Sequence, residues 1–200
     1  MDIITRITSL VWPCMSAAIL YIYFFIIKSD SKIDSLTGIG NRYSFNEFMN
    51  KLSTQNITED YTIAMLDLDR FKEINDTLGH LEGDNALRDT AAIIRSCIRH
   101  SDFAARYGGD EFILAAKAEN DIQRIVDRIN EAINTQNRMR VRPYQLYMSY
   151  GYDVYTTNSG RSIQDFIAHV DSLMYKNKEA RRKEIPSAIT AKIDNEEKNV

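Results

Sequence analysis

The chain has 200 residues and a formal net charge of −3, from 25 lysines and arginines against 28 aspartates and glutamates. This length favours one globular domain with appendages. The near balance of charge excludes a protein that attracts nucleic acid or anionic lipid over its whole surface, so any recognition of phosphate must be local. Cys14 and Cys97 lie far apart in unlike surroundings, which argues against a disulfide framework and suits a reducing cytosol.

Residues 7–27 form 21 consecutive positions without a charge. As a helix rising ~1.5 Å per residue they would reach about 31 Å, the thickness of a bilayer core. We therefore expect an N-terminal segment (1–6), one transmembrane helix (7–27) and a short linker (28–33). A cleaved signal peptide and a buried core helix are the alternatives, although no small-x-small cleavage site follows the run. The lysines that follow the run favour a cytoplasmic domain.

Helical and strand patterns alternate from residue 34 to residue 184, which predicts a single α/β or α+β domain. A polar tail, 185–200, is expected to be disordered. The expected elements are a helix at 44–52 capped by Ser44, a strand at 61–68, a helix at 84–98, strands at 103–107 and 111–116 joined by a tight turn, a helix at 121–133, a strand at 145–155 and a helix over 163–174.

Carboxylates gather at the predicted strand ends. Asp67 and Asp69 project from one face of a strand because side chains alternate with a period of two. Two carboxylates so close repel each other unless a cation is present, and Mg²⁺ prefers such hard oxygen ligands together with substrate phosphates. Asp110 and Glu111, at the predicted turn, are candidates for the remaining acidic ligands. Either cluster alone is also typical of a solvated strand end or turn.

The predicted turn contains Gly108 and Gly109. Glycine permits a positive φ and leaves no side chain where a backbone must approach a phosphate or a base. A glycine pair alone is weak evidence of function. Here it lies within the string Arg-Tyr-Gly-Gly-Asp-Glu-Phe, residues 106–112, and that string is specific.

With this string the chain from Asp34 to Lys183 resembles the GGDEF family of diguanylate cyclases. Residues 34–42 are similar to the family's first motif, with Gly40 where a proline is usual. Residues 67–76, followed by Gly79-His80 and Gly83-Asp84, are similar to its metal and nucleotide motif. The closing motif departs from the family pattern, because Asn177 replaces a usual alanine and Arg181 a usual glycine.

The resemblance implies an α+β fold, with a central, mostly antiparallel sheet flanked by helices as in nucleotide cyclases and polymerase palms. It also implies an enzyme that condenses two GTP molecules into cyclic di-GMP. The expected metal is Mg²⁺ or Mn²⁺, held by Asp67, the carbonyl of Leu68 and Asp110. Glu111 is expected to be essential, in metal binding or in activating the attacking hydroxyl.

The same resemblance implies how GTP is bound. Guanine presents both donors and acceptors, which an amide and a carboxylate can match, and these roles fall on Asn75 and Asp84. The alternative, without a role in binding, is that both residues are helix caps. Triphosphate charge requires cations, for which Lys72, Lys178 and Arg182 are the candidates, and the alternative for the last two is a solvated basic helix end. Further substrate contacts are expected at Phe71, Gly108 and Gly109.

Arg99 and Asp102 lie upstream of the signature at the spacing of the family's inhibitory product site, so cyclic di-GMP is expected to bind there. Because one domain holds one GTP, the resemblance also implies a homodimer, placed by the membrane helix at the bacterial inner membrane. No nucleic acid is expected as a partner. Two rival interpretations stay open: a catalytically silent cyclic di-GMP receptor, and a membrane assembly module.

Overall fold

The computed structural model describes residues 11–22, 32–54, 59–118, 122–156, 160–183 and 187–189, and the chain divides into two compact units, Met1–Lys32 and Ile33–Val200. In the first unit, residues 11–22 are helical. Within the described residues, no helix is both long enough and apolar enough to cross a bilayer. The predicted span continues on both sides of this helix, over residues 7–10 and 23–27, which lie outside the described part of the chain.

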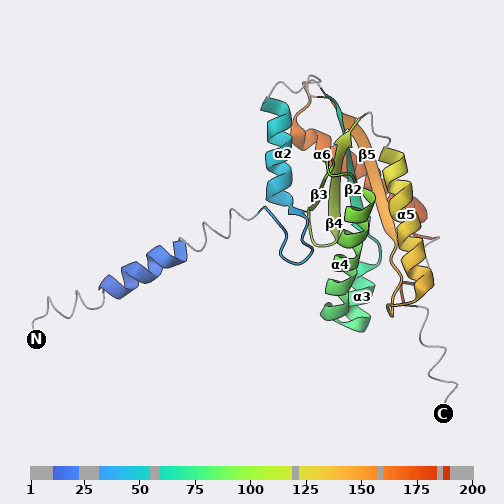
Figure 1. The fold of residues 1–200 in the computed structure, drawn as a ribbon, viewed down its shortest axis with the longest axis horizontal. Coiled ribbons are helices and arrows are strands. Elements are labelled where there is room, and N and C mark those ends of the chain that lie inside the picture. The colour runs from blue at the N-terminus through green and yellow to red at the C-terminus, as the bar shows by residue number, and fades with distance from the viewer. Residues whose placement is uncertain are drawn as a thin grey trace, which may run out of the picture. The chain divides into compact units, whose positions relative to one another are not determined.

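The second unit is built on a mixed five-stranded sheet with the order β1-β3-β4-β2-β5 (Figure 1). The first and third strands, β1 and β3, are parallel, and the other three pairs are antiparallel. This arrangement confirms the predicted α+β class. The strands are β1 (Gly40–Asn41), β2 (Tyr61–Leu68), β3 (Phe103–Arg106), β4 (Glu111–Lys117) and β5 (Met148–Tyr155).

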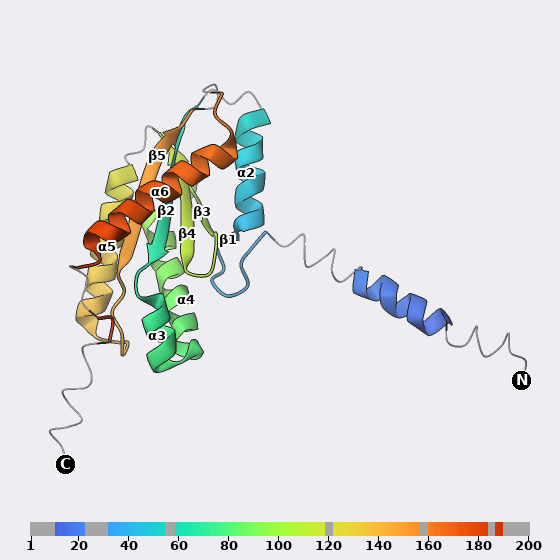
Figure 2. The same cartoon turned by 180° about the vertical axis from the view of Figure 1, so that it is seen from behind.

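Helices cover both faces of the sheet, and alternate residues of β2 point toward different helices. Ala64 and Leu66 pack with α3 (Phe71–Leu78), α4 (His80–Cys97) and α5 (Ile122–Met139). Ile63 and Met65 pack on the other face. Figure 2 shows α6 lying across that second face, beside α2. The two helices there are α2 (Arg42–Thr54) and α6 (Ile163–Arg181).

The start of α2 differs from the prediction. Its cap is Asn41, whose Oδ1 accepts a hydrogen bond from the Ser44 backbone N–H at 2.9 Å. In return, Ser44 Oγ accepts from the Asn41 N–H at 2.9 Å. The predicted cap at Ser44 is therefore wrong, because Ser44 holds the third helical position of a reciprocal capping pair.

Two other predictions need changes. The predicted helix at 84–98 is present as α4 but begins earlier, at His80, and α3, which was not predicted, precedes it across Gly79, whose φ is +85°. In the tail, Ala188 is buried and its carbonyl accepts a hydrogen bond from the Gln145 N–H at 2.8 Å. Residues 187–189 are therefore packed rather than disordered, while the other positions of the predicted tail lie outside the described residues.

Candidate functional site

The predicted carboxylates meet on the α6 face of the sheet. Asp67 pairs with Glu111 across β2 and β4, and the Leu68 N–H donates to the Asp110 carbonyl at 3.0 Å. Asp67 follows Ile63 and Met65 on the same side of β2, so it points toward α6. Asp67 and Asp69 are only 6% and 3% exposed. The sheet register thus brings together acidic residues that are more than forty positions apart.

Helix α6 supplies the basic side of the site. Lys178 Nζ lies 2.5 Å from Asp67 Oδ1. Asp171, Tyr175 and Arg182 share its helical face, at spacings of three and four residues. Beneath this face is a cavity of about 500 Å³, lined by Asp67, Asp69, Arg70, Glu111, Asp171, Met174, Tyr175, Lys178, Glu179 and Arg182.

The distance between α6 and β5 is set by Gly151. A Cβ atom at this position would lie 2.1 Å from the Met174 backbone nitrogen and 2.6 Å from the Leu173 carbonyl carbon. Only glycine lets the two backbones approach so closely. This contact places the C-terminal half of α6 over the carboxylates.

The departures from the family pattern have a structural role in the same contact. Asn177 Oδ1 accepts a hydrogen bond from the Tyr150 N–H at 3.2 Å, and the Arg181 guanidinium donates to the Met148 carbonyl. Both residues therefore bind backbone groups of the edge strand β5. Neither lines the cavity.

Burial and mutual repulsion raise the pKa values of the signature carboxyls. For Asp110 the main cause is burial, followed by the charge of Asp67. For Glu111 burial is again first, followed by the charges of Asp67, Asp110 and Asp171. A cation placed among these groups would relieve the repulsion.

Two of the buried carboxylates have partners: Ser149 binds Asp69, and Lys178 pairs with Asp67. Burial raises the pKa of Asp69, although Ser149 Oγ donates to both of its carboxylate oxygens at 2.8 and 2.9 Å. Burial tends to lower the pKa of Lys178, but the hydrogen bond and charge of Asp67 outweigh it and raise this pKa above its ordinary value. Lys178 therefore carries its full positive charge beside Asp67.

The donor set suits a hard divalent cation, since Asp67 and Asp110 offer carboxylate oxygens near a strand carbonyl at Leu68. Among the residues that the structure describes, no three acidic, histidine or cysteine side chains are already gathered at metal-binding distance. Instead the ammonium group of Lys178 contacts Asp67. A metal at Asp67 would thus bind where the lysine charge now lies.

The signature turn is held by Arg106. Its Nε and one terminal nitrogen donate to the Gly109 carbonyl at 3.0 and 2.7 Å, and its other terminal nitrogen lies 3.4 Å from Asp34. Neither glycine of the turn has a positive φ, so the turn does not use the left-handed conformation that glycine permits. A Cβ at Gly108 would lie 2.5 Å from Glu111 Oε2, whereas one at Gly109 would meet open space. Gly108 therefore leaves room for the glutamate.

The predicted guanine residues lie on the other side of the sheet, on α3 and α4. A Cβ at Gly83 would lie 2.0 Å from Asn75 Oδ1, so the amide rests directly against the α4 backbone beside Asp84. Helix α3 starts after Arg70, which has a φ of +57°, and no side chain caps its first N–H groups. Its first two residues, Phe71 and Lys72, lie outside the lining of the α6 cavity, as do Gly108 and Gly109.

The prediction from sequence missed several residues of the site. Ser149 binds Asp69, and Asp171 and Tyr175 line the cavity beside Lys178. The spacing of Asp171, Tyr175 and Lys178 on one helical face was the available signal. Nothing local marked Ser149, because its partner is 80 positions away in the sequence.

Arg99 and Asp102 form the turn between α4 and β3. Asp102 Oδ2 accepts from the Arg99 N–H at 2.9 Å, and the Asp102 N–H donates to the Arg99 carbonyl at 3.0 Å. Through these two bonds Asp102 caps the turn. A product-binding role for the pair stays a prediction.

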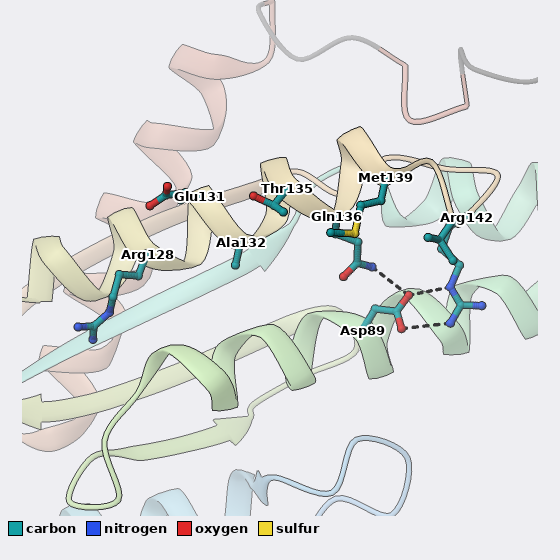
Figure 3. Close-up of a pocket in the computed structure, with 9 residues that line it drawn as sticks. Asp89, Arg128, Glu131, Ala132, Thr135, Gln136, Met139 and Arg142 are labelled. Carbon is teal, nitrogen blue, oxygen red and sulfur yellow. Dashed lines mark hydrogen bonds and ion pairs between the residues drawn. The ribbon is translucent and has the colours of Figure 1, made fainter.

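A separate cavity of about 640 Å³ lies between α4 and α5 (Figure 3). Asp89 lines this cavity, and its carboxylate accepts hydrogen bonds from Arg142 at 2.8 and 3.1 Å and from Gln136 at 3.1 Å. The Tyr144 hydroxyl donates to the same carboxylate at 3.3 Å. No predicted site residue lines this cavity, and its polar groups serve to join α4, α5 and the segment that leads to β5.

The chain is similar to known proteins over most of its length. Residues 31–184 match the family model described as "Diguanylate cyclase, GGDEF domain". The chain is 34% identical over 152 residues to the cyclic di-GMP phosphodiesterase PdeR of Escherichia coli, covering 74% of this chain and 23% of that protein. It is 33% identical over 150 residues to diguanylate cyclase A of Treponema denticola, covering 72% of this chain and 40% of that protein. The chain thus spans less than half of either relative.

Among solved structures, the fold is similar to the GGDEF domain of DgcB from Caulobacter crescentus in complex with c-di-GMP. The TM-score is 0.65 at 25% identity, covering 76% of this chain and 92% of the other.

Proposed function

Because this chain belongs to the GGDEF domain family, we propose that it is a diguanylate cyclase, which condenses two GTP molecules into cyclic di-GMP and releases pyrophosphate. One observation carries the proposal. Asp67, Glu111 and Lys178, from β2, β4 and α6, converge on one cavity at the end of the sheet. Carboxylates for a divalent cation and a lysine for phosphate are what nucleotidyl transfer requires.

The residues of the site have separate roles in this proposal. Asp67, Asp110 and the Leu68 carbonyl would hold Mg²⁺ or Mn²⁺, which would supply positive charge for the α-phosphate. Glu111 accepts the proton of the attacking 3′-hydroxyl. Burial, the main cause of its raised pKa, makes it a stronger base than an ordinary carboxylate.

The nucleotide is held at both ends. Asn75 and Asp84 recognise guanine from the α3–α4 pair, and Phe71 and the N–H groups that begin α3 make further contacts with the nucleotide. Lys178 and Arg182 bind the triphosphate within the cavity. Gly108 and Gly109 allow the nucleotide to approach the turn, and Lys72 provides a further cation for the phosphates.

Catalysis requires two domains, because one domain binds one GTP and the reaction joins two. We propose a homodimer with its catalytic domains in the cytoplasm and residues 7–27 as a single-pass anchor in the bacterial inner membrane. Cyclic di-GMP bound at Arg99 and Asp102 would inhibit the enzyme. The guanidinium can stack on guanine, and the carboxylate can accept from its edge.

The deciding experiment uses the full chain in nanodiscs with GTP and Mg²⁺, after removal of co-purified nucleotide. Cyclic di-GMP is followed by chromatography with mass detection, beside an Asp110→Asn variant that keeps the shape of the side chain. We expect product from the parent and a loss of at least about 100-fold in the variant. Equal rates in both proteins, or no product from folded dimers of the parent, would refute the cyclase proposal.

A catalytically silent cyclic di-GMP receptor is the second candidate. The chain is similar to part of PdeR, a protein named as a phosphodiesterase, so a relative with this kind of domain carries a name other than cyclase. Such a receptor would bind cyclic di-GMP in a manner that depends on Arg99 and would need neither GTP nor metal. Calorimetric titration of both nucleotides, with and without Mg²⁺, separates the two functions.

A further inference from the structure

A cavity of about 650 Å³ lies between α2 and α6 and adjoins the catalytic cavity. Glu111 and Asp171 line both of them. Along α6, the catalytic cavity extends from Asp171 toward Arg182, whereas this second cavity extends from Asp171 back toward Ile163. Glu111 therefore stands between two cavities that open in opposite directions along the helix.

Arg42 projects from α2 into the lining of the second cavity. Its guanidinium carbon lies 4.7 Å from the centre of the Tyr107 ring, and the Tyr107 N–H donates to the Glu111 carbonyl at 2.8 Å. Within the described residues, the exposed Arg42 side chain forms no ion pair with a carboxylate. An aromatic ring thus positions an unneutralised cation close to the signature turn.

Besides the carboxylates of Glu111 and Asp171 and the Tyr107 ring, the polar groups that line this cavity are amides, from Asn46 and Asn50 on α2 and Gln164 on α6. Amides both donate and accept hydrogen bonds, as sugar hydroxyls do. Among the described residues that line the cavity, Arg42 is the one cation, so the cavity suits a ribose carrying a single nearby phosphate. It does not suit a whole triphosphate, for which the Lys178 and Arg182 side is better provided.

The geometry of nucleotidyl transfer connects the two cavities. The attacking and leaving oxygens must lie in line on opposite sides of the phosphorus. If pyrophosphate leaves on the side of Lys178 and Arg182, the attacking hydroxyl approaches from the side of the α2–α6 cavity. Glu111 lines both cavities, so it can accept the proton of a hydroxyl that approaches from this side.

We propose that the α2–α6 cavity is the acceptor subsite, which receives the ribose of the second GTP, and that Arg42 contacts the α-phosphate of that second nucleotide. This inference rests on the proposed cyclase function. The 3′-oxygen of the second GTP bonds to the α-phosphorus of the first, and its proton passes to Glu111. The bond from that phosphorus to the oxygen bridging to the β-phosphate breaks, and pyrophosphate leaves.

The first test compares the full-chain parent with Arg42→Ala in nanodiscs. We expect the variant's affinity for α,β-methylene GTP, which cannot release pyrophosphate, to fall far less than its turnover, because each nucleotide is held mainly by its own subunit. Turnover should fall by about 100-fold, because the attacking hydroxyl is no longer aligned. Arg161→Ala is the matched control, since Arg161 also lies over an aromatic ring, Phe166, at 5.4 Å but outside this cavity. It should retain parental turnover.

A second test asks in which subunit Arg42 acts, using mixed dimers with two affinity tags. A parent subunit paired with an Asp110→Asn, Arg42→Ala double variant keeps one complete site and should produce the linear dinucleotide. An Asp110→Asn subunit paired with an Arg42→Ala subunit has no complete site and should not. The acceptor-subsite proposal is overturned by the reverse pattern, or by loss of the dinucleotide in both pairs.

The outcomes separate the two proposals. If the parent makes cyclic di-GMP and Arg42→Ala does so equally well, the acceptor subsite is wrong while the cyclase stands. If Arg42→Ala weakens binding of the methylene analogue as much as it lowers turnover, Arg42 serves the nucleotide of its own subunit. An inactive, folded parent contradicts the proposed function itself. Asn46→Ala provides a second variant, with a smaller expected loss of turnover, should Arg42→Ala fail to fold.

Discussion

Gly83 leaves no space for a methyl group beside Asn75, so the smallest possible substitution there should disturb base recognition. In Gly83→Ala the new Cβ would lie 2.0 Å from Asn75 Oδ1 and force the amide to move. Because only the end of a side chain must shift, the fold should tolerate the change. We expect GTP binding to weaken by about tenfold, the cost of a lost hydrogen bond to the base.

Titration calorimetry with GTP and ATP checks this expectation, since the variant should also lose part of its preference for GTP. Asn85→Ala, on the same helix, is the control that should bind GTP as the parent does. Unchanged GTP affinity in a correctly folded Gly83→Ala protein would remove Asn75 from the guanine site.

The signature carboxyls should make stability depend on pH. A carboxyl whose pKa is raised by folding contributes stability that is fully present below its unfolded pKa of about 4 and is lost as the pH rises through the folded pKa. Asp110 and Glu111 both have raised pKa values, mainly through burial. In a chelator, the metal-free protein should therefore lose stability as the pH rises above about 4.

Asp110→Asn removes one of these charges and should flatten that pH dependence. At pH 7 the variant should be more stable than the parent by about 1 kcal/mol, a gain commonly seen when a functional charge is removed. Thermal unfolding from about pH 4 to about pH 8 measures the effect, and Glu131→Gln on the exposed face of α5 provides the control. A parent no less stable at the upper end of this range than at the lower end would contradict the prediction.

At the scale of elements, the position of α6 depends on its closest approach to β5. In Gly151→Ala the added Cβ would meet the Met174 nitrogen and the Leu173 carbonyl carbon, which are backbone atoms and cannot rotate away. We expect a loss of about 3 kcal/mol in the free energy of unfolding. Activity should fall further than stability alone explains, because Lys178 moves with the helix.

Urea unfolding and turnover of the same preparations test this prediction. Gly109→Ala provides a control for stability, since a Cβ there meets nothing and the backbone φ is not left-handed. Its free energy of unfolding should match that of the parent. A Gly151→Ala protein of parental stability would show that α6 can withdraw from the sheet at little cost.

The elements that sequence predicted well are those with strong local signals. The bounds of β2 agree with the predicted strand because the buried run from Tyr61 to Leu68 ends in a carboxylate and a turn. Helix α4 was predicted with a late start and α3 was not predicted, since the boundary between them at Gly79 depends on a positive φ that glycine permits but does not require. Asn41 was missed as a cap because it also closes the short strand β1.

The site could be predicted only as far as the resemblance reached. Carboxylates at strand ends were visible in the sequence, but the contact between Lys178 and Asp67 joins positions 111 residues apart. In the sequence, Asn177 and Arg181 stand out only as departures from the family's closing motif. Their bonds to the β5 backbone give them a structural role, and such tertiary partners leave no local pattern.

At the scale of the whole molecule, the proposed cyclase holds half of its reaction in each copy. Its specific activity should then depend on how often two copies meet. In proteoliposomes, raising the lipid-to-protein ratio should lower turnover per molecule, approaching proportionality at high dilution. Covalently crosslinked dimers diluted in the same way should keep their activity, and a dilution-independent rate without crosslinking would contradict the model of two half-sites.

The ion pair between Lys178 and Asp67 makes cation binding an exchange. A metal that binds at Asp67 must first displace the Lys178 ammonium group. The free energy needed to break this ion pair lowers the affinity of the nucleotide-free protein for the metal. A triphosphate offers the released lysine a new anion. Nucleotide and metal should therefore bind with positive heterotropic coupling, each strengthening the other by the same factor.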